Sequence, residues 1–321
     1  MLPKREVIEA AGKIVYEVMS PTAQYCWPLL SERLGTEIWL KHENHTPVGA
    51  FKIRGGLVYF AELAKYGQVP RGVISATRGN HGQSVGLAAR KHGIAAKIVV
   101  PHGNSTEKNA AMKALGVDLI EHGTEFQEAR EYAKKLAEDL SLLMVPSFHP
   151  LLVAGVATYS LELLTAVPDL DLAYVPIGLG SGICGMMAAR EALGHKAKIV
   201  GVVSAHARAY AKSFAAKKPV ESPVNTRLAD GIACSTTDPE ALELILAGVD
   251  RIIEVTDAEI AEAMRTIFEC THNVSEGAGA AGFAAAMQEK EKLGGLKVGV
   301  VLSGGNVDRD LFAAVLSSKS F

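Results

Sequence analysis

The sequence predicts an α/β protein with two lobes, each built on a largely parallel sheet that helices cover. Short β-branched runs alternate with longer alanine-rich amphipathic runs, which is typical of βα units. Residues 72–77 (GVISAT) precede residues 79–93 (GNHGQSVGLAARKHG), and residues 95–101 (AAKIVVP) precede residues 105–116 (STEKNAAMKALG). With 321 residues, 48% of them hydrophobic, the chain can also bury two cores.

The same alternation continues along the chain and indicates where the lobes divide. Further strands are expected at residues 36–43, 117–123, 142–147, 172–178, 197–204, 251–255 and 297–305, and further helices at residues 125–140 and 257–270. The pattern is interrupted near residues 53 and 148. We therefore expect a large domain of residues 1–52 and 148–321, and a small domain of residues 53–147. A cleft between two lobes is a favoured ligand site.

Composition argues against several classes of function. The 33 basic and 35 acidic residues are scattered and give a net charge of −2, so we expect no surface for nucleic acid. The four cysteines, Cys26, Cys184, Cys234 and Cys270, are widely spaced, which indicates neither a disulfide framework nor a zinc site and favours a reducing cytoplasm. The N-terminus is charged where a signal peptide would be apolar, so we expect no signal peptide. No apolar run is long enough to cross a membrane, so we expect no membrane span.

A lysine in an unusual setting lies within residues 43–56 (ENHTPVGAFKIRGG). Lys52 stands between Phe51 and Ile53 at the start of a helix-like run, with glycines on both sides. Apolar neighbours desolvate an ammonium group and lower its pKa, which suits an amine nucleophile. For this stretch alone, a partly covered lysine at a helix start is slightly the better interpretation.

Residues 174–185 (YVPIGLGSGICG) predict a strand, a glycine turn over residues 178–182, and a helix that begins near Ile183. Glycines allow an anion to approach closely, and the turn amides together with the helix N-terminus would bind a phosphate. The turn fits a dinucleotide fingerprint, a site for a single phosphate, or only a tight strand–helix turn. The fingerprint is disfavoured because the loop lies in mid-chain and the next strand ends in Val203 and Ser204, without an acidic residue.

Two further strand-to-helix turns carry polar groups. In residues 75–84 (SATRGNHGQS), Thr77 and the neighbouring amides predict a carboxylate site, although an ordinary capped helix gives the same pattern. Ser303 places a neutral hydroxyl at the carboxyl end of the last apolar strand. A packed histidine explains His81 as well as a catalytic one does, and a helix start is the better explanation of Glu276.

Together these features describe one site with an amine nucleophile, a phosphate cup, a carboxylate cup and a neutral hydroxyl. A cofactor with an aldehyde, a phosphate and a heteroaromatic nitrogen requires the first, second and fourth of these groups. An amino-acid substrate requires the third. The cofactor with these groups is pyridoxal 5′-phosphate, which a lysine holds as a Schiff base.

The order of the motifs resembles the fold type II pyridoxal-phosphate enzymes, in particular the serine/threonine dehydratase and serine racemase family, over nearly the whole chain. The matching segments are ENHTPVGAFKIRGG (43–56), TRGNHGQ (77–83), GLGSGICG (178–185), LADGIA (228–233) and LSGGN (302–306). The resemblance implies a homodimeric dehydratase, or ammonia-lyase. Such an enzyme converts a β-hydroxy amino acid (threonine, serine, 3-hydroxyaspartate or phenylserine) to an α-keto acid and ammonia.

The resemblance also implies roles for individual residues. Lys52 would hold the cofactor and then act as the base that takes the α-proton, with Phe51 against the cofactor. Asn80 would hydrogen-bond the ring hydroxyl, and Ser303 would face the pyridine nitrogen. The implied phosphate loop is Gly178, Leu179, Gly180, Ser181 and Gly182. The implied substrate contacts are Thr77, Arg78, Gly79, Asn80 and His81.

Some features depart from the family pattern. Arg78 replaces the usual Ser or Ala, so racemisation through that serine is not expected. The guanidinium would pair with a side-chain carboxylate of the substrate, or line the cleft mouth in salt bridges. Ala50 replaces a serine near the reacting centre. Val203 and Ala209 stand where racemase-like members carry cation-binding carboxylates, so no metal is expected there. The chain ends at Phe321, so no regulatory domain is expected.

Other functions remain open at this point. A β-replacement enzyme such as a cysteine synthase, or a racemase, shares the fold, but TRGNHGQ favours the dehydratase branch. A nucleotide-binding oxidoreductase built around residues 178–182 belongs to a different class, and a cofactor absorption spectrum would distinguish it. A catalytically inactive ligand sensor is disfavoured because Lys52, Asn80 and Ser303 are present together.

Overall fold

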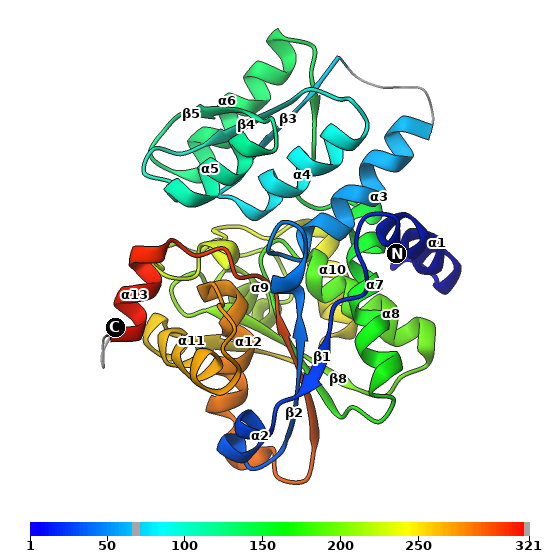
Figure 1. Ribbon diagram of the computed structural model, residues 1–321, viewed down its shortest axis with the longest axis vertical. Coiled ribbons are helices and arrows are strands. Elements are labelled where there is room, and N and C mark those ends of the chain that lie inside the picture. The colour runs from blue at the N-terminus through cyan, green and yellow to red at the C-terminus, as the bar shows by residue number, and fades with distance from the viewer. Residues whose placement is uncertain (66–70, 318–321) are drawn as a thin grey trace.

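A computed structural model describes residues 1–65 and 71–317 and shows two lobes, each with its own sheet (Figure 1). This confirms the predicted fold class of helix-covered, largely parallel sheets. The predicted domain ranges include residues 66–70 and 318–321, which lie outside the described residues. The exact domain boundaries stay a prediction.

The sheet of the large lobe has the strand order β1-β2-β10-β7-β8-β9. Its strands are β1 Gln24–Cys26, β2 Glu37–His42, β7 Leu172–Pro176, β8 Lys198–Ser204, β9 Arg251–Val255 and β10 Lys297–Leu302. Every neighbouring pair is parallel except β1 and β2. The sequence does not predict β1, because three residues are too few to show an alternating pattern.

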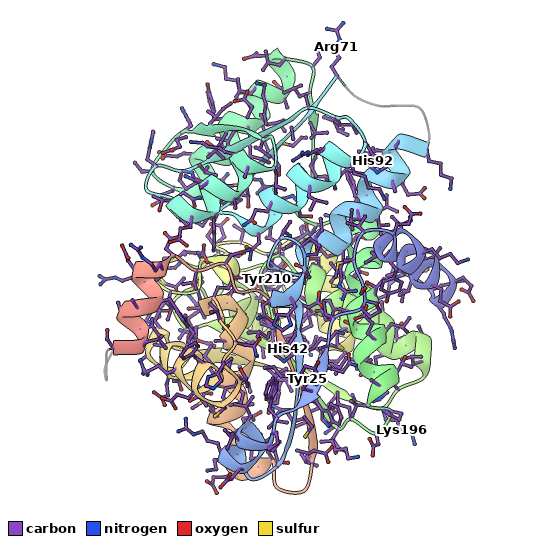
Figure 2. The ribbon with its side chains drawn as sticks, in the orientation of Figure 1. Tyr25, His42, Arg71, His92, Lys196 and Tyr210 are labelled. Carbon is purple, nitrogen blue, oxygen red and sulfur yellow. The ribbon has the colours of Figure 1, made fainter. Side chains whose placement is uncertain are left out.

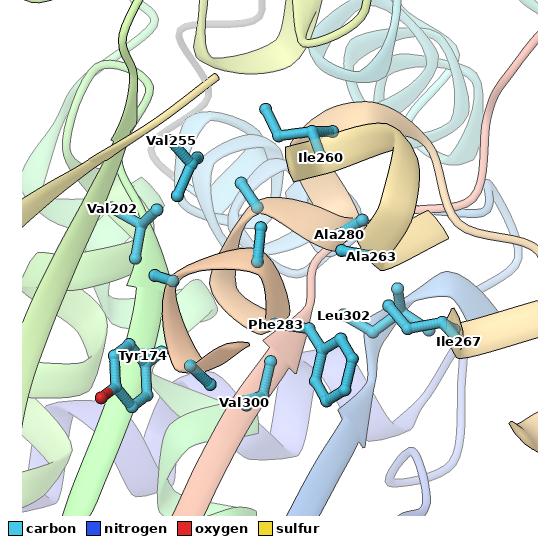
Figure 3. Close-up of a cluster of buried hydrophobic side chains, with 14 of the residues drawn as sticks. Tyr174, Val202, Val255, Ile260, Ala263, Ile267, Ala280, Phe283, Val300 and Leu302 are labelled. Carbon is cyan, nitrogen blue, oxygen red and sulfur yellow. The ribbon is translucent and has the colours of Figure 1, made fainter. Parts of the chain in front are cut away.

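Helices cover both faces of this sheet, and the side-chain alternation of the strands shows which helix covers which face. In β7, Tyr174 packs in one core with Phe283 of α12 (Gly277–Gln288), as Figure 3 shows, together with α11 (Asp257–Thr271). Its neighbour Val175 packs in a second core with α7 (Pro150–Ala166) and α8 (Ser181–Leu193). The other helices of this lobe are α1 Arg5–Tyr16, α2 Pro28–Leu34, α9 Ala209–Ala216, α10 Pro239–Gly248 and α13 Arg309–Ser317, with short 3₁₀ turns η1 Glu43–His45, η2 Asp230–Ile232 and η3 Lys290–Lys292.

The small lobe has a parallel sheet of order β5-β4-β3-β6. Its strands are β3 Val73–Ala76, β4 Ala96–Val100, β5 Asp118–Glu121 and β6 Leu143–Met144, and its helices are α3 Lys52–Lys65, α4 Asn80–Lys91, α5 Thr106–Ala114 and α6 Phe126–Asp139. In β3, Val73 packs toward α3 and α4, whereas Ile74 packs toward α6. Both faces of the sheet are therefore covered, as the continuous apolar strands predict.

Helix α3, which begins at Lys52, crosses α7 at a glycine pair. A Cβ atom on Gly155 of α7 would lie 2.2 Å from the Arg54 carbonyl oxygen, and a Cβ on Gly55 would lie 2.8 Å from the Leu152 carbonyl oxygen. Only glycines allow the two backbones to approach this closely. The crossing fixes the start of α3, and with it Lys52, against the large lobe.

We expect the Gly155→Ala substitution to destabilise the protein by roughly 1–3 kcal/mol, because backbone atoms on both helices must move to admit one methyl group. The midpoint of urea unfolding measures this change. Gly294→Ala is the matched control, because a Cβ there meets no atom within 4 Å. Equal stability of the two variants would contradict the close crossing.

The carboxyl ends of the parallel strands point toward the space between the lobes, where ligands of open α/β sheets bind. Residues that follow β3, β7 and β10 there are Thr77, Gly178 and Ser303. In the described part of the chain, every helix is too short or too polar to cross a membrane.

Candidate active site

A pocket between the lobes is lined by segments from both of them. It collects every residue that the sequence predicts for cofactor or substrate, namely Phe51, Lys52, Thr77, Arg78, Gly79, Asn80, His81, Gly178, Leu179, Gly180, Ser181, Gly182 and Ser303. The individual roles of these residues stay predictions. Their convergence from four separate segments makes this pocket the candidate active site.

Lys52 opens α3 with its amine directed at the glycine loop. Its Nζ lies 3.4 Å from Ser181 Oγ and 5.2 Å from the centroid of the Phe51 ring. Burial lowers the pKa of Lys52, although the nearby Cys234 acts in the opposite direction. A lowered pKa raises the fraction of neutral amine, which is the form that attacks an aldehyde or accepts a proton.

The glycine loop leads into α8, which begins at Ser181, two residues before the predicted start. Gly180 has φ +103°, and a Cβ there would lie 2.6 Å from the Ala241 Cβ, so the turn requires glycine. Tyr210, labelled in Figure 2, donates its hydroxyl to the Leu179 carbonyl at 3.1 Å and accepts from the Asp238 amide at 3.1 Å. The loop is thus held rigidly beside a helix N-terminus.

These residues fit pyridoxal phosphate. Gly180, the N-cap of α8, has no side chain to satisfy the first helix amides, so those N–H groups are available to an anion. The amine of Lys52 lies within reach of Ser181 at the same helix start. One pocket therefore offers phosphate donors next to an amine that can bind an aldehyde.

Asn80 and Ser303 lie on the walls of the same pocket. Asn80 Nδ2 donates to Glu276 Oε1 at 2.6 Å, and Asn80 Oδ1 accepts from Asn306 Nδ2 at 2.9 Å. Because an amide carries two hydrogens, one donor of Asn80 remains for a ring hydroxyl. Ser303 is buried, and its carbonyl accepts from the Phe51 amide at 3.1 Å. This hydrogen bond fixes Ser303 next to the segment that contains Phe51 and Lys52.

The turn after β3 has the features of a carboxylate site. Thr77 Oγ1 accepts from the Gly79 amide at 3.0 Å, and α4 begins at Asn80 without a side-chain cap. Its first amides are therefore available to a carboxylate. Burial lowers the pKa of His81 to about 3, which favours the neutral form of this histidine at physiological pH.

A charged cluster that no sequence motif predicts joins the two lobes. Lys108 of α5 places its Nζ 2.6 Å from Asp230 Oδ2 and 3.4 Å from Glu276 Oε2, both in the large lobe. Burial acts to lower the pKa of Lys108, but the two carboxylates outweigh it and raise the pKa, so Lys108 stays charged. A lysine within an amphipathic helix looks like a surface residue, and no local signal shows which distant acids it meets.

Replacing Lys108 by methionine is expected to destabilise the protein by roughly 3 kcal/mol, because the buried carboxyl group of Glu276 loses its cation. Lys113→Met in the same helix is the matched control, since Lys113 is exposed. Adding Glu276→Gln should recover part of the loss. Thermal unfolding measures all three effects, and a Lys108→Met variant as stable as the control would contradict the interaction.

No metal is predicted at the end of β8, and the chain offers apolar side chains there. Val203 and Ala209 are both buried, and Val203 belongs to the hydrophobic core that α7 and α8 form. Within residues 1–65 and 71–317, no group of three or more His, Cys, Asp or Glu side chains is arranged to hold a metal ion. Insensitivity of the enzyme to chelators stays a prediction.

Comparisons with known proteins agree with this geometry. The family model described as "Pyridoxal-phosphate dependent enzyme" matches residues 17–304. An L-threonine ammonia-lyase of Thermotoga maritima is 34% identical over 97% of this chain and 78% of its own, and an L-threo-3-hydroxyaspartate ammonia-lyase of Saccharomyces cerevisiae is 32% identical over 98% and 96%. The structure of maize serine racemase superposes with a TM-score of 0.90 at 28% identity, covering 98% of this chain and 96% of that one.

The chain therefore belongs to the pyridoxal-phosphate dependent enzyme family. The findings confirm the predicted cofactor and the predicted class of enzyme, a carbon–oxygen lyase of the threonine/serine dehydratase type. Family membership also argues against the nucleotide-binding oxidoreductase, which the position of the glycine loop already disfavours.

Proposed function

We propose that this enzyme removes water from a β-hydroxy amino acid and releases an α-keto acid and ammonia, with Lys52 as its catalytic residue. The observation that carries the proposal is the position of the Lys52 amine, 3.4 Å from Ser181 at the start of α8 and in one pocket with the turn after β3. The first place suits a phosphate and the second a carboxylate.

When bound, pyridoxal phosphate supplies an aldehyde that bonds to amines and a ring that withdraws electrons from the substrate Cα. The amides at the start of α8 would hold the phosphate, the free donor of Asn80 would bind the ring hydroxyl, and Ser303 would contact the ring nitrogen. Phe51 lies beside Lys52 and covers one side of the pocket. Each of these protein groups is neutral. They would therefore orient the ring through hydrogen bonds and packing, and not through an ion pair with the ring.

The substrate carboxylate binds the first amides of α4 and the hydroxyl of Thr77, which places Cα toward Lys52. Burial lowers the pKa of the Lys52 amine, and this favours its uncharged form as the base that takes the α-proton. Loss of hydroxide from Cβ then leaves a product that water converts to the α-keto acid and ammonia. Lys52 thus acts twice, as the attachment point and as the base.

Relatives of this chain are named for different substrates. Those reported above are named for threonine and for 3-hydroxyaspartate, and serine and phenylserine share the same reacting atoms. A panel of these four amino acids, assayed for α-keto acid and ammonia with purified holoenzyme, tests the proposal. Release from at least one of them is expected. Formation only of an inverted amino acid, or only of a thioether in the presence of a thiol, would instead establish the racemase or the β-replacement enzyme.

The proposal includes a homodimer in the cytoplasm, as the resemblance and the scattered free cysteines favour. Sedimentation equilibrium of the holoenzyme measures the first property, and fractionation of the producing cells measures the second. A fully active monomer would contradict the proposed homodimer but would not affect the proposed reaction.

A further inference from the structure

We propose that the substrate is a 2-amino-3-hydroxy dicarboxylic acid, such as 3-hydroxyaspartate, and that Arg78 binds its side-chain carboxylate. The inference rests on the proposed function and specifies the substrate of the same site. The sequence leaves two roles open for Arg78, a pair with such a carboxylate or salt bridges at the cleft mouth. The contacts of Arg78 decide between them.

Arg78 lines the pocket in the turn between β3 and α4. Its Nε is buried and has no hydrogen-bond partner. Across residues 1–65 and 71–317, no acidic side chain forms an ion pair with Arg78, so the salt-bridge role lacks a partner there. A guanidinium nitrogen shielded from water without an acceptor is unfavourable, and a ligand oxygen would relieve the cost.

The other charges of the pocket are already matched within the protein. The carboxylates of Asp230 and Glu276 both lie against Lys108. Lys52 is the attachment point of the cofactor. Among the charged side chains that line the pocket, Arg78 is therefore the cation left for a substrate group.

Two other anions enter the site, but the structure provides each with donors of its own. The cofactor phosphate fits the helix start at Ser181, across the pocket in the large lobe. The α-carboxylate of the substrate fits the first amides of α4 and Thr77. Arg78 lines this pocket together with Lys52 and Cys234, so its side chain is left for a third anionic group.

A carboxylate on Cβ matches what Arg78 offers. The guanidinium carries donors in a planar fork that binds both oxygens of a carboxylate. Serine and threonine carry no side-chain carboxylate and would leave this fork unpaired, and a site built for a polar group discriminates strongly against analogues that lack it. With 3-hydroxyaspartate, loss of water from Cα–Cβ followed by uptake of one water yields oxaloacetate and ammonia, so the atoms balance without an oxidant or reductant.

The test compares wild type with Arg78→Met, which removes the charge, and Arg78→Lys, which keeps the charge but removes the fork. Arg130→Met is the matched control, because Arg130 is exposed on α6 of the same lobe. For 3-hydroxyaspartate, kcat/KM should fall at least about 30-fold in Arg78→Met, less in Arg78→Lys, and not in the control. For serine, Arg78→Met should leave kcat/KM unchanged or raise it, because serine makes no side-chain pair and the variant no longer holds a guanidinium without an acceptor.

Binding without turnover separates this inference from the proposed function. Aspartate and alanine lack the β-hydroxyl, so neither can lose water, and calorimetry of the holoenzyme measures their affinities. Wild type should bind aspartate more tightly than alanine, and Arg78→Met should remove that preference. Equal losses for both ligands would assign Arg78 to the α-carboxylate and overturn the inference, as would no loss for either. If no β-hydroxy amino acid releases a keto acid while aspartate binding still depends on Arg78, the proposed function fails and the carboxylate site stands.

Discussion

Replacing Lys52 by alanine will lower keto-acid release by at least about 1,000-fold, because the proposed function assigns to this one side chain both the amine that holds the cofactor and the base for the α-proton. The structure places this amine 3.4 Å from Ser181 at the start of α8, and burial lowers its pKa. Both properties depend on the position at the start of α3. Initial rates with saturating cofactor and substrate measure the effect.

Two controls show whether a loss of activity comes from chemistry. Lys196→Ala, at an exposed lysine labelled in Figure 2, should retain the wild-type rate. Lys52→Ala should keep the wild-type circular dichroism spectrum, since Lys52 Nζ contacts only the Ser181 hydroxyl among the hydrogen-bond partners described. A Lys52→Ala enzyme that still turns over at a tenth of the wild-type rate would disprove both roles.

Arg54→Met is expected to be the most destabilising single substitution considered, at about 3–5 kcal/mol. Arg54 is fully buried two residues after Lys52, and its guanidinium binds Glu43 at 2.7 and 2.9 Å and Glu162 at 2.6 and 3.1 Å. Glu43 follows β2 and Glu162 belongs to α7, so this cluster joins α3 to the large lobe. Removing the cation leaves a buried carboxylate unpaired.

Chemical unfolding measures this loss against two comparisons. Arg5→Met removes an exposed pair with Glu9 and should cost less than about 1 kcal/mol. The double substitution Arg54→Met and Glu43→Gln should be less destabilised than Arg54→Met alone, because a neutral amide tolerates burial better than an unpaired charge. If the double variant is the less stable of the two, the loss does not come from an unpaired carboxylate.

The same cluster predicts how stability depends on pH. Burial acts to raise the pKa of Glu162, but Arg54 and Lys41 outweigh it and hold the pKa below its ordinary value of 4.5. A carboxyl whose pKa is lowered by folding stabilises the protein above its unfolded-state pKa, and this contribution is lost as the pH falls through the folded-state value. Wild-type stability should therefore fall below about pH 4.5, and Arg54→Met should show a shallower fall.

Local patterns predict most of the fold because they reflect local physics. Runs such as residues 72–77 and 251–255 are β-branched and bounded by turns, so they form strands in this chain as they would in many others. β1 is the exception, since residues 24–26 pair with β2 through tertiary contacts and not through a pattern of their own. The start of α8 is displaced to Ser181 because Gly180 adopts a left-handed conformation that the sequence only permits.

The sequence likewise predicts some of the polar and charged contacts in and near the candidate site and not others. Residues that follow strands, such as Thr77 and Ser303, can be predicted because parallel strands deliver their ends to one edge. Lys108 and Arg54 could not be predicted, because each meets acids more than a hundred residues away, Asp230 in one case and Glu162 in the other. Such pairs depend on how the two lobes pack, which leaves no periodic signal in the chain.

The proposed chemistry depends on a covalent bond between Lys52 and the cofactor. Reduction of active holoenzyme with borohydride, followed by digestion and mass spectrometry, tests it directly. We expect a pyridoxyl-phosphate adduct on the peptide that contains Lys52 and on no other lysine. An unmodified Lys52 in enzyme that was active before reduction, or an adduct at a different lysine, would contradict it.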